Sequence, residues 1–318
     1  MQKHMDHCRK RKKKKNGEFT SVLAAMGPLI GFTLFGLIPL ILATVVSMTE
    51  LHSTNLSEME FIGLENYKTV ITNGDNRTYA SYLSTLVFAL NVPICIGIAL
   101  YIANLVNRTK IGQRFLRSVF FIPYVCSTVV IGLTFRILFN QESGVFNTIL
   151  TSLGFEKVGW LTESPFTFMT STIIMTVWSG LGFCIVLFQA ALANVNESYY
   201  EAARIDGASN FQIFWKITWP AISPTTGYLV TMKMIWGLQA MTETYILSGN
   251  NTVVPTWGSS DAWVSDLVVK HIYNMVFVNP YQYGYGLAAA AGWCLAIVVL
   301  IVTFLNMKLQ ERWVNYDF

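Results

Sequence analysis

Four polar or aromatic side chains lie close together in an otherwise apolar stretch near residue 240: Lys233, Trp236, Gln239 and Glu243. In a continuous helix the last three recur at i, i+3 and i+7, so they share one face, and Lys233 lies at its edge. The stripe would be roughly 10 Å long at about 1.5 Å per residue. An indole stacks on a sugar ring while an amide and a carboxylate bond its hydroxyls, so this face suits a neutral polyhydroxylated ligand. The alternative is polar contact between neighbouring helices.

The stripe lies in one of six apolar segments. Only 13% of the 318 residues are charged, 53% are hydrophobic and the mean hydropathy is +0.44. Soluble domains carry about 25% charged residues, so the composition predicts an all-α membrane protein. The six predicted transmembrane helices are residues 22–48, 79–106, 118–139, 166–193, 225–248 and 283–307. Gly180, Gly182 and the small residues 288–292 predict close helix packing.

The first predicted helix follows a tail with eight Lys and Arg residues among its first fifteen positions. Its apolar run is longer than the roughly 7–15 residues of a signal-peptide core, so we expect an uncleaved helix. With the N-terminus inside, 16 of the 22 Lys and Arg residues fall in inner segments and four in outer loops. The positive-inside rule therefore places both termini, and the charged segment 200–224, on the cytoplasmic side.

The sequence lacks the residue patterns that nucleotide binding, metal binding and catalysis require. No GxxxxGK[ST] sequence occurs, so we expect no nucleotide cofactor in this chain, and any ATP–Mg would bind another polypeptide. The five cysteines show no CxxC and no Cys–His spacing, which indicates packing residues and predicts no metal site. We expect no catalytic group, and a basic tail directly before a span indicates topology more than nucleic-acid binding.

The charged segment 200–224 lies between two apolar stretches. Residues 164–196 before it and residues 217–232 at its end and beyond contain no Asp, Glu, Lys or Arg. Ser198 is expected to cap a short helix that Gly207 ends. Ser209 and Gln212 fit a capping box at the start of a second helix. The pattern predicts a helix–Gly–helix elbow at the membrane surface.

The order of residues in this elbow is Glu-Ala-Ala, three residues, Gly, nine residues, Ile, one residue and Trp-Pro. It resembles the EAA loop of ATP-binding-cassette (ABC) importer permeases, in which Ile-x-Leu-Pro follows EAA and Gly at this spacing. Trp219 stands where that family has Leu, so packing around the second helix is expected to differ. In the family this loop docks into a cleft of the ATPase subunit. The resemblance carries this coupling role to Glu201, Ala202, Ala203, Gly207, Ile217 and Pro220.

Three further segments resemble the carbohydrate-uptake branch of that family, which includes the maltose permease: residues 61–70 (FIGLENYKTV), 120–125 (FFIPYV) and 237–250 (GLQAMTETYILSGN). Met241 and Thr242 replace an aromatic and an acidic residue of the family pattern. Similar permeases hold a sugar among their middle spans. The resulting candidates for a substrate path are Trp236, Gln239, Glu243, Tyr245, Trp178, Phe183 and Trp293. For the last three, the alternative is aromatic packing between helices.

The resemblance implies the type I ABC importer permease fold. The chain then divides into a cytoplasmic basic tail, residues 1–20, and a transmembrane permease domain, residues 21–318. The permease core is about 79–307 and the coupling loop is 194–224. The implied location is a bacterial inner (plasma) membrane.

The implied partners are a second homologous permease, two ABC ATPase subunits, an extracytoplasmic solute-binding protein, a carbohydrate substrate and the lipid bilayer, with no nucleic acid. One alternative is an ion-coupled secondary transporter of a small polar solute, in which Lys233 and Glu243 form a proton relay. Another is a membrane structural protein, which would not need a polar stripe.

Overall fold

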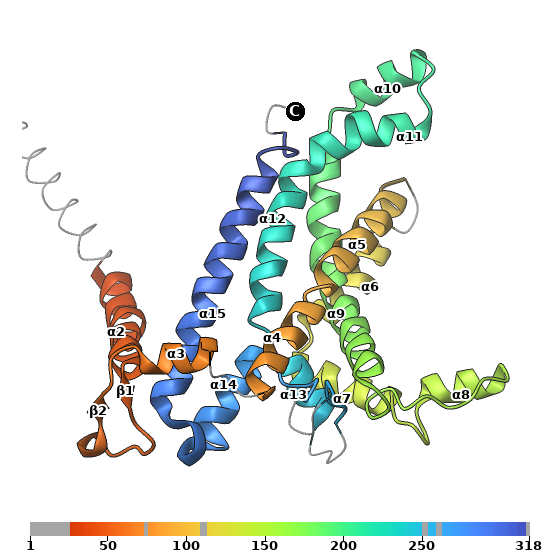
Figure 1. Cartoon of the computed structure of the whole chain (residues 1–318). Helices are drawn as coiled ribbons and strands as arrows, with labels where there is room; N and C mark the ends of the chain where they lie inside the picture. Colours follow the sequence, from red (N-terminus) through yellow and green to blue (C-terminus); the bar gives the residue numbers. More distant parts are fainter. Residues whose placement is uncertain (1–25, 73–75, 109–112, 250–253, 259–262, 316–318) are drawn as a thin grey trace, which may run out of the picture.

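The computed structural model describes residues 26–72, 76–108, 113–249, 254–258 and 263–315, and helices dominate these ranges (Figure 1). The predicted tail, residues 1–20, lies outside them. The longer helices are α2 (Ile38–Ser47), α4 (Asn76–Phe88), α5 (Asn91–Arg108), α6 (Gln113–Val125), α7 (Thr128–Leu138), α9 (Pro165–Ala193), α12 (Trp219–Leu238) and α15 (Pro280–Gln310).

The shorter helices are α3 (Glu65–Thr72), α8 (Val145–Ser152), α10 (Glu197–Ile205), α11 (Asn210–Ile213), α13 (Thr242–Ser248) and α14 (Val268–Phe277). The described residues also form the π-helical turns η1 (Thr33–Leu37) and η3 (Phe214–Thr218) and the 3-10 turn η2 (Leu56–Glu58). The strands β1 (Thr49–Glu50) and β2 (Glu60–Phe61) pair antiparallel, with Thr49 opposite Phe61.

Within the described residues, four helical stretches are long and apolar enough to cross a membrane: Met26–Ser47, Arg77–Asn107, Pro165–Ala193 and Pro280–Gln310. They correspond to the predicted first, second, fourth and sixth spans. The bent pair α6–α7 makes a fifth if it counts as one span. The more polar α12 is not among them, so the count of six spans stays a prediction, while the predominantly helical membrane fold is confirmed.

The predicted third span is not a continuous helix. The α6 and α7 axes are bent by 97° relative to each other at the break between Val125 and Thr128. Pro123 lies inside α6 and has no backbone N–H to donate. Ser127 is extended, with φ −59° and ψ 132°, so the chain changes direction there.

The predicted fifth span is also broken, so the expectation of one stripe on one helix face is wrong. Helix α12 ends at Leu238 and α13 begins at Thr242. The Glu243 carboxylate interacts with the backbone amides of Met241 and of Glu243 itself. Such an interaction satisfies amides that have no partner at a helix start, which favours a new N-terminus at this point.

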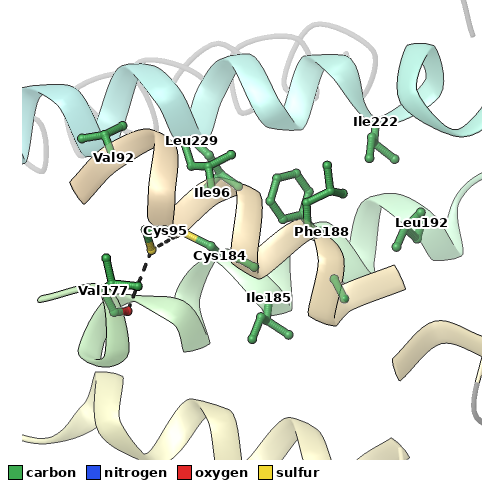
Figure 2. Close-up of a cluster of buried hydrophobic side chains, with 13 residues drawn as sticks. Val92, Cys95, Ile96, Val177, Cys184, Ile185, Phe188, Leu192, Ile222 and Leu229 are labelled. Atoms are coloured by element: carbon green, nitrogen blue, oxygen red, sulfur yellow. Dashed lines mark hydrogen bonds between the residues drawn. The ribbon is translucent and has the colours of Figure 1, made fainter. Parts of the chain in front are cut away.

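The largest buried cluster lies between α5, α9 and α12 (Figure 2). The members labelled there are Val92, Cys95 and Ile96 of α5, Val177, Cys184, Ile185, Phe188 and Leu192 of α9, and Ile222 and Leu229 of α12. Cys95 and Cys184 are buried free thiols with their Sγ atoms 4.0 Å apart. Their predicted packing role is confirmed, whereas Cys126 is exposed.

Small residues bring these helices together, as predicted. A Cβ at Gly182 of α9 would collide with the Phe120 carbonyl oxygen of α6. In α15, the buried Ala288, Ala290 and Ala291 pack in a second cluster with Val70 and Met275. Because lipid tails are as apolar as Leu, such close van der Waals contact stabilises helix pairs in a membrane.

The two ends of the molecule differ (Figure 1). Helices α10 and α11 project at the end where α15 finishes, while α8, α13, α14 and the β1–β2 hairpin lie at the opposite end. Arg204 of α10 and Lys308 of α15 are therefore on the first end, and Lys270 of α14 is on the second. Which of these two ends faces the cytoplasm stays a prediction.

Candidate functional site

The elbow, residues 194–224, consists of α10, α11, η3 and the start of α12. Asn196 caps α10, because its side-chain oxygen accepts a hydrogen bond from the Ser198 backbone amide at 3.0 Å. The predicted cap at Ser198 is wrong, since the helix already begins at Glu197. The capping box of Ser209 and Gln212 is confirmed, with the Ser209 amide donating to Gln212 Oε1 at 2.8 Å and the Gln212 amide to Ser209 Oγ at 3.3 Å.

Gly207 ends α10 as predicted. Its φ of +75° lies in the left-handed region that glycine adopts without strain. The Ala208 amide donates to the Ala203 carbonyl at 2.9 Å, and the Gly207 amide donates to the Arg204 carbonyl at 3.1 Å. These two bonds form a Schellman motif, which fixes the angle between α10 and α11.

The outer surface of the elbow exposes both polar and apolar groups. Glu201 and Ala202 are exposed, and Ala203 is partly buried. Ile205 is 86% exposed and Phe211 is 72% exposed. The sequence analysis missed these two, although large apolar residues in a charged segment were a usable signal. Apolar side chains grouped on a projecting surface are typical of a protein interaction site.

The inner angle of the elbow encloses a cavity of about 420 Å³. The predicted coupling residues Ala203, Gly207 and Ile217 line it. Pro220 follows the π-helical turn η3 in a helical run that continues from α11 into α12, and its nitrogen has no N–H to donate within that run. The structure therefore brings three of the six predicted coupling residues to one cavity, and the coupling role of all six stays a prediction.

The C-terminal segment packs against the elbow, which the sequence analysis did not predict. The Trp313 ring stacks on Trp219 with ring centroids 5.9 Å apart and an interplanar angle of 21°. The Asn315 backbone amide donates to Ser223 Oγ at 2.8 Å. The indole at position 219 thus packs against the chain's own C-terminal segment.

A second cavity, of about 260 Å³, lies where three helix breaks meet. The breaks are those between α4 and α5, between α6 and α7, and between α12 and α13. Residues beside them that line the cavity are Phe88, Asn91, Cys126, Thr128 and Ala240. Irregular backbone at membrane depth is tolerated where it borders a cavity, and transporters place binding sites at such discontinuous helices.

The cavity gathers only part of the predicted substrate path. Trp236 and Glu243 both line it, although they belong to different helices. Gln239 is exposed and does not line it. Tyr245 instead lines a cavity of about 550 Å³ at the end of the molecule opposite the elbow. These placements correct the predicted stripe, and the substrate role of each residue stays a prediction.

The three further aromatic candidates lie at different distances from this cavity. Phe183 lies between Tyr124 and Trp236, with ring centroids 5.2 Å and 5.7 Å away, and both neighbours line the cavity. Trp178 packs on Phe135 at 5.4 Å. Trp293 of α15 is partly buried and lines none of the cavities described above. Phe183 therefore supports the aromatic wall from behind.

Lys233 of α12 also lines the cavity, and it is only 8% exposed. Its ammonium group lies directly against the Cα of Gly180 in α9, where any Cβ would collide with it. Thr176 and Ser179 of α9 line the same wall. The sequence placed Lys233 at the edge of a stripe, whereas the structure places it inside the cavity.

The cavity that Tyr245 lines is bordered by a buried ionic cluster. Asp266 Oδ2 accepts hydrogen bonds from Arg77 Nε at 2.8 Å and lies 2.8 Å from Arg77 Nη2. Lys270 Nζ lies 3.3 Å from Asp266 Oδ1 and donates to Ser248 Oγ at 3.0 Å. Burial lowers the pKa of Lys270, and the Asp266 carboxylate opposes this shift. The cluster ties α4, α13 and α14 together.

Comparison with known proteins gives a consistent result. Residues 94–316 match the family model of the binding-protein-dependent transport system inner membrane component. YesP of Bacillus subtilis (strain 168), a probable ABC transporter permease protein, is 30% identical over 292 residues, which cover 91% of this chain and 89% of YesP. AraP of the same strain, the arabinooligosaccharides transport system permease protein, is 32% identical over 286 residues, which cover 89% of this chain and 85% of AraP.

The fold also matches a solved structure. A chain of a bacterial alginate ABC transporter, crystallised in complex with an alginate pentasaccharide-bound periplasmic protein, superposes with a TM-score of 0.78 at 22% identity. The match covers 94% of this chain and 96% of that chain. The family model spans more than half of the sequence and includes the elbow, most of the residues that line the cavity and the C-terminal segment. The chain therefore belongs to the family of binding-protein-dependent transport system inner membrane components.

Proposed function

We propose that this chain is a permease subunit of an ABC importer that takes up a sugar or oligosaccharide delivered by an extracytoplasmic solute-binding protein. The observation that carries the proposal is the course of α12, which begins in the elbow at Trp219 and ends at the cavity with Leu238. At about 1.5 Å per residue, a helix of 20 residues spans roughly 30 Å. A movement of the elbow therefore reaches the cavity through one continuous helix.

In this proposal the elbow docks on a cytoplasmic ATPase subunit. Glu201, Ala202, Ala203, Gly207, Ile217 and Pro220 form the coupling unit. The exposed Ile205 and Phe211 supply apolar contact area beside them. ATP–Mg binds to two ATPase subunits, and this chain holds no cofactor.

The mid-membrane cavity is the proposed substrate path. Trp236 offers an aromatic face, and Glu243 and Asn91 offer polar groups for hydroxyls. Oligosaccharide transport by AraP, which matches most of this chain, supports a sugar substrate. A second, homologous permease chain would complete the wall. Closure of the ATPases would draw the two elbows together and switch the cavity between inward-open and outward-open states.

The orientation follows the charge distribution. The N-terminus, the elbow and the C-terminus face the cytoplasm of a bacterial cell, and α8, α13 and α14 face outward toward the binding protein. The ion-coupled carrier is less well supported, because the matched family depends on a binding protein.

The test is ATP hydrolysis by the reconstituted complex, with and without sugar-loaded binding protein. We expect the Gly207→Asp variant to assemble and to lose the stimulation, because an Asp at φ +75° strains the turn that sets the elbow angle. Gly154→Asp is the matched control. Gly154 has φ +85°, has nothing within 4 Å of a Cβ, and lies near α8 at the opposite end. If Gly207→Asp keeps full stimulation, the proposed coupling role is wrong.

A further inference from the structure

Lys233 is a buried cation in the proposed substrate cavity, and its charge has no close counter-ion. Among the residues that the structure describes, no carboxylate lies within 4.0 Å of its ammonium nitrogen. An ionisable side chain inside a membrane protein is costly unless it pairs or serves a ligand. The fit of the ammonium against Gly180 shows that α9 leaves space for this group.

The neighbours of Lys233 do not neutralise it. The hydroxyl groups of Thr176 and Ser179 donate to the carbonyl oxygens of Thr172 and Thr176 in their own helix, at 2.8 and 3.1 Å. The Cys95 thiol makes a side-chain hydrogen bond with Lys233, and Cys95 belongs to the buried cluster between α5, α9 and α12. The hydroxyl groups of Thr176 and Ser179 carry no charge.

Glu243 is the acidic residue on the cavity wall, and it attracts Lys233 electrostatically, although no oxygen of its carboxylate lies within 4.0 Å of the Lys233 ammonium nitrogen. Its carboxylate interacts with the backbone amides of Met241 and Glu243 at the start of α13. The positive end of a helix dipole stabilises an anion at this position. Lys233 lies in α12 five residues before Leu238, the last residue of that helix.

The opposite wall adds partial positive charge. Helix α7 begins at Thr128, which lines the cavity, and its N-cap residue Ser127 makes no side-chain capping bond. The N-terminal amides of this helix therefore remain free of a side-chain cap beside the cavity. Lys233 and the start of α7 together favour a negatively charged group between them.

We propose that the substrate is an acidic sugar, with its carboxylate bound by Lys233 and its ring against Trp236. This inference rests on the proposed function and narrows the sugar to uronic-acid-containing oligosaccharides. It also revises the neutral ligand expected from the residue pattern, because that pattern did not place Lys233 inside the cavity.

The test measures saccharide binding to the assembled complex in lipid nanodiscs. The probes are uronic-acid oligosaccharides and neutral hexose oligosaccharides of the same lengths. Lengths of about two to four sugars are used, because their volume is of the same order of magnitude as that of a ligand pocket. We expect the wild type to bind the acidic set at least about tenfold more tightly, and Lys233→Met to remove that preference, since truncating one partner of a buried charge pair is strongly unfavourable. Lys308→Met is the control, because it removes the same charge from an exposed position at the end of α15.

Each outcome decides between the two proposals. If the wild type binds neutral saccharides as tightly as acidic ones, the acidic-sugar inference is wrong and the sugar importer stands. If Lys233→Met keeps the acidic preference, Lys233 is not the counter-ion. If neither set binds, both the sugar proposal and this inference fail. Should Lys233→Met not assemble, Lys233→Gln and the wild-type preference still decide the question.

Discussion

The elbow and the mid-membrane cavity are assembled in opposite ways. The elbow is one consecutive segment, residues 194–224, and its caps and turns are held by bonds between residues at most a few positions apart. The Tyr200–Thr218 hydrogen bond and the contacts with the C-terminal segment add to them. The cavity takes its wall from α4, α5, α6, α7, α9, α12 and α13. Short-range chemistry therefore fixes the shape of the elbow, whereas the cavity exists only when distant segments pack. A local change should perturb the elbow mildly, and a packing change should disrupt the cavity.

The largest expected effect follows from a packing change behind the cavity. Gly182→Ala forces α9 away from the Phe120 carbonyl of α6, and overpacking of this kind costs about 1–3 kcal/mol. We expect a lower melting temperature of the purified complex and a loss of transport. Gly97→Ala is the control, because nothing lies within 4 Å of a Cβ at that position of α5. Equal melting temperatures for the two variants would show that the α6–α9 contact does not hold the cavity together.

A smaller effect is expected from the capping box of the elbow. Ser209→Ala removes a cap worth about 1 kcal/mol of local helix stability. Gln212→Ala breaks the reciprocal bond, so the double variant should cost less than the two single variants combined. Hydrogen exchange of the amides of residues 210–213 measures this. Strictly additive effects would mean that the two side chains do not act as a unit.

The same contrast explains what the sequence could predict. Gly207, Ser209 and Gln212 were assigned correctly, because turn and cap preferences depend on immediate neighbours. The cap of α10 was misplaced because Asn196 and Ser198 are both good capping residues, and the sequence alone does not rank them.

The cavity was predicted less well, and for a physical reason. The sequence on both sides of the α6–α7 break is apolar, and no Gly or Pro lies between Leu238 and Thr242 at the α12–α13 break, so the residue pattern predicts one span where the structure has two helices. Gln239 therefore does not lie on one helix face with Trp236 and Glu243, as the pattern predicted. Lys233 entered the cavity because Gly180, more than fifty positions earlier, leaves room for its ammonium group. Contacts over such separations leave no periodic signal in a single sequence.

The contact between the C-terminal segment and the elbow is another long-range contact that the sequence did not predict. The substitution of Trp for the family's Leu at position 219 predicted a change in packing. Its partner, Trp313, could not be predicted because it lies more than ninety positions later in the sequence.

The most direct measurement compares sugar uptake and ATP hydrolysis in the same proteoliposomes for wild type, Gly207→Asp and Trp236→Ala. The account predicts that Gly207→Asp loses both binding-protein-stimulated hydrolysis and uptake. It predicts that Trp236→Ala keeps the stimulated hydrolysis but imports less sugar for each ATP hydrolysed, because the cavity loses its aromatic face while the elbow is intact. Normal uptake by Gly207→Asp would contradict the claim that the elbow drives the cavity through α12.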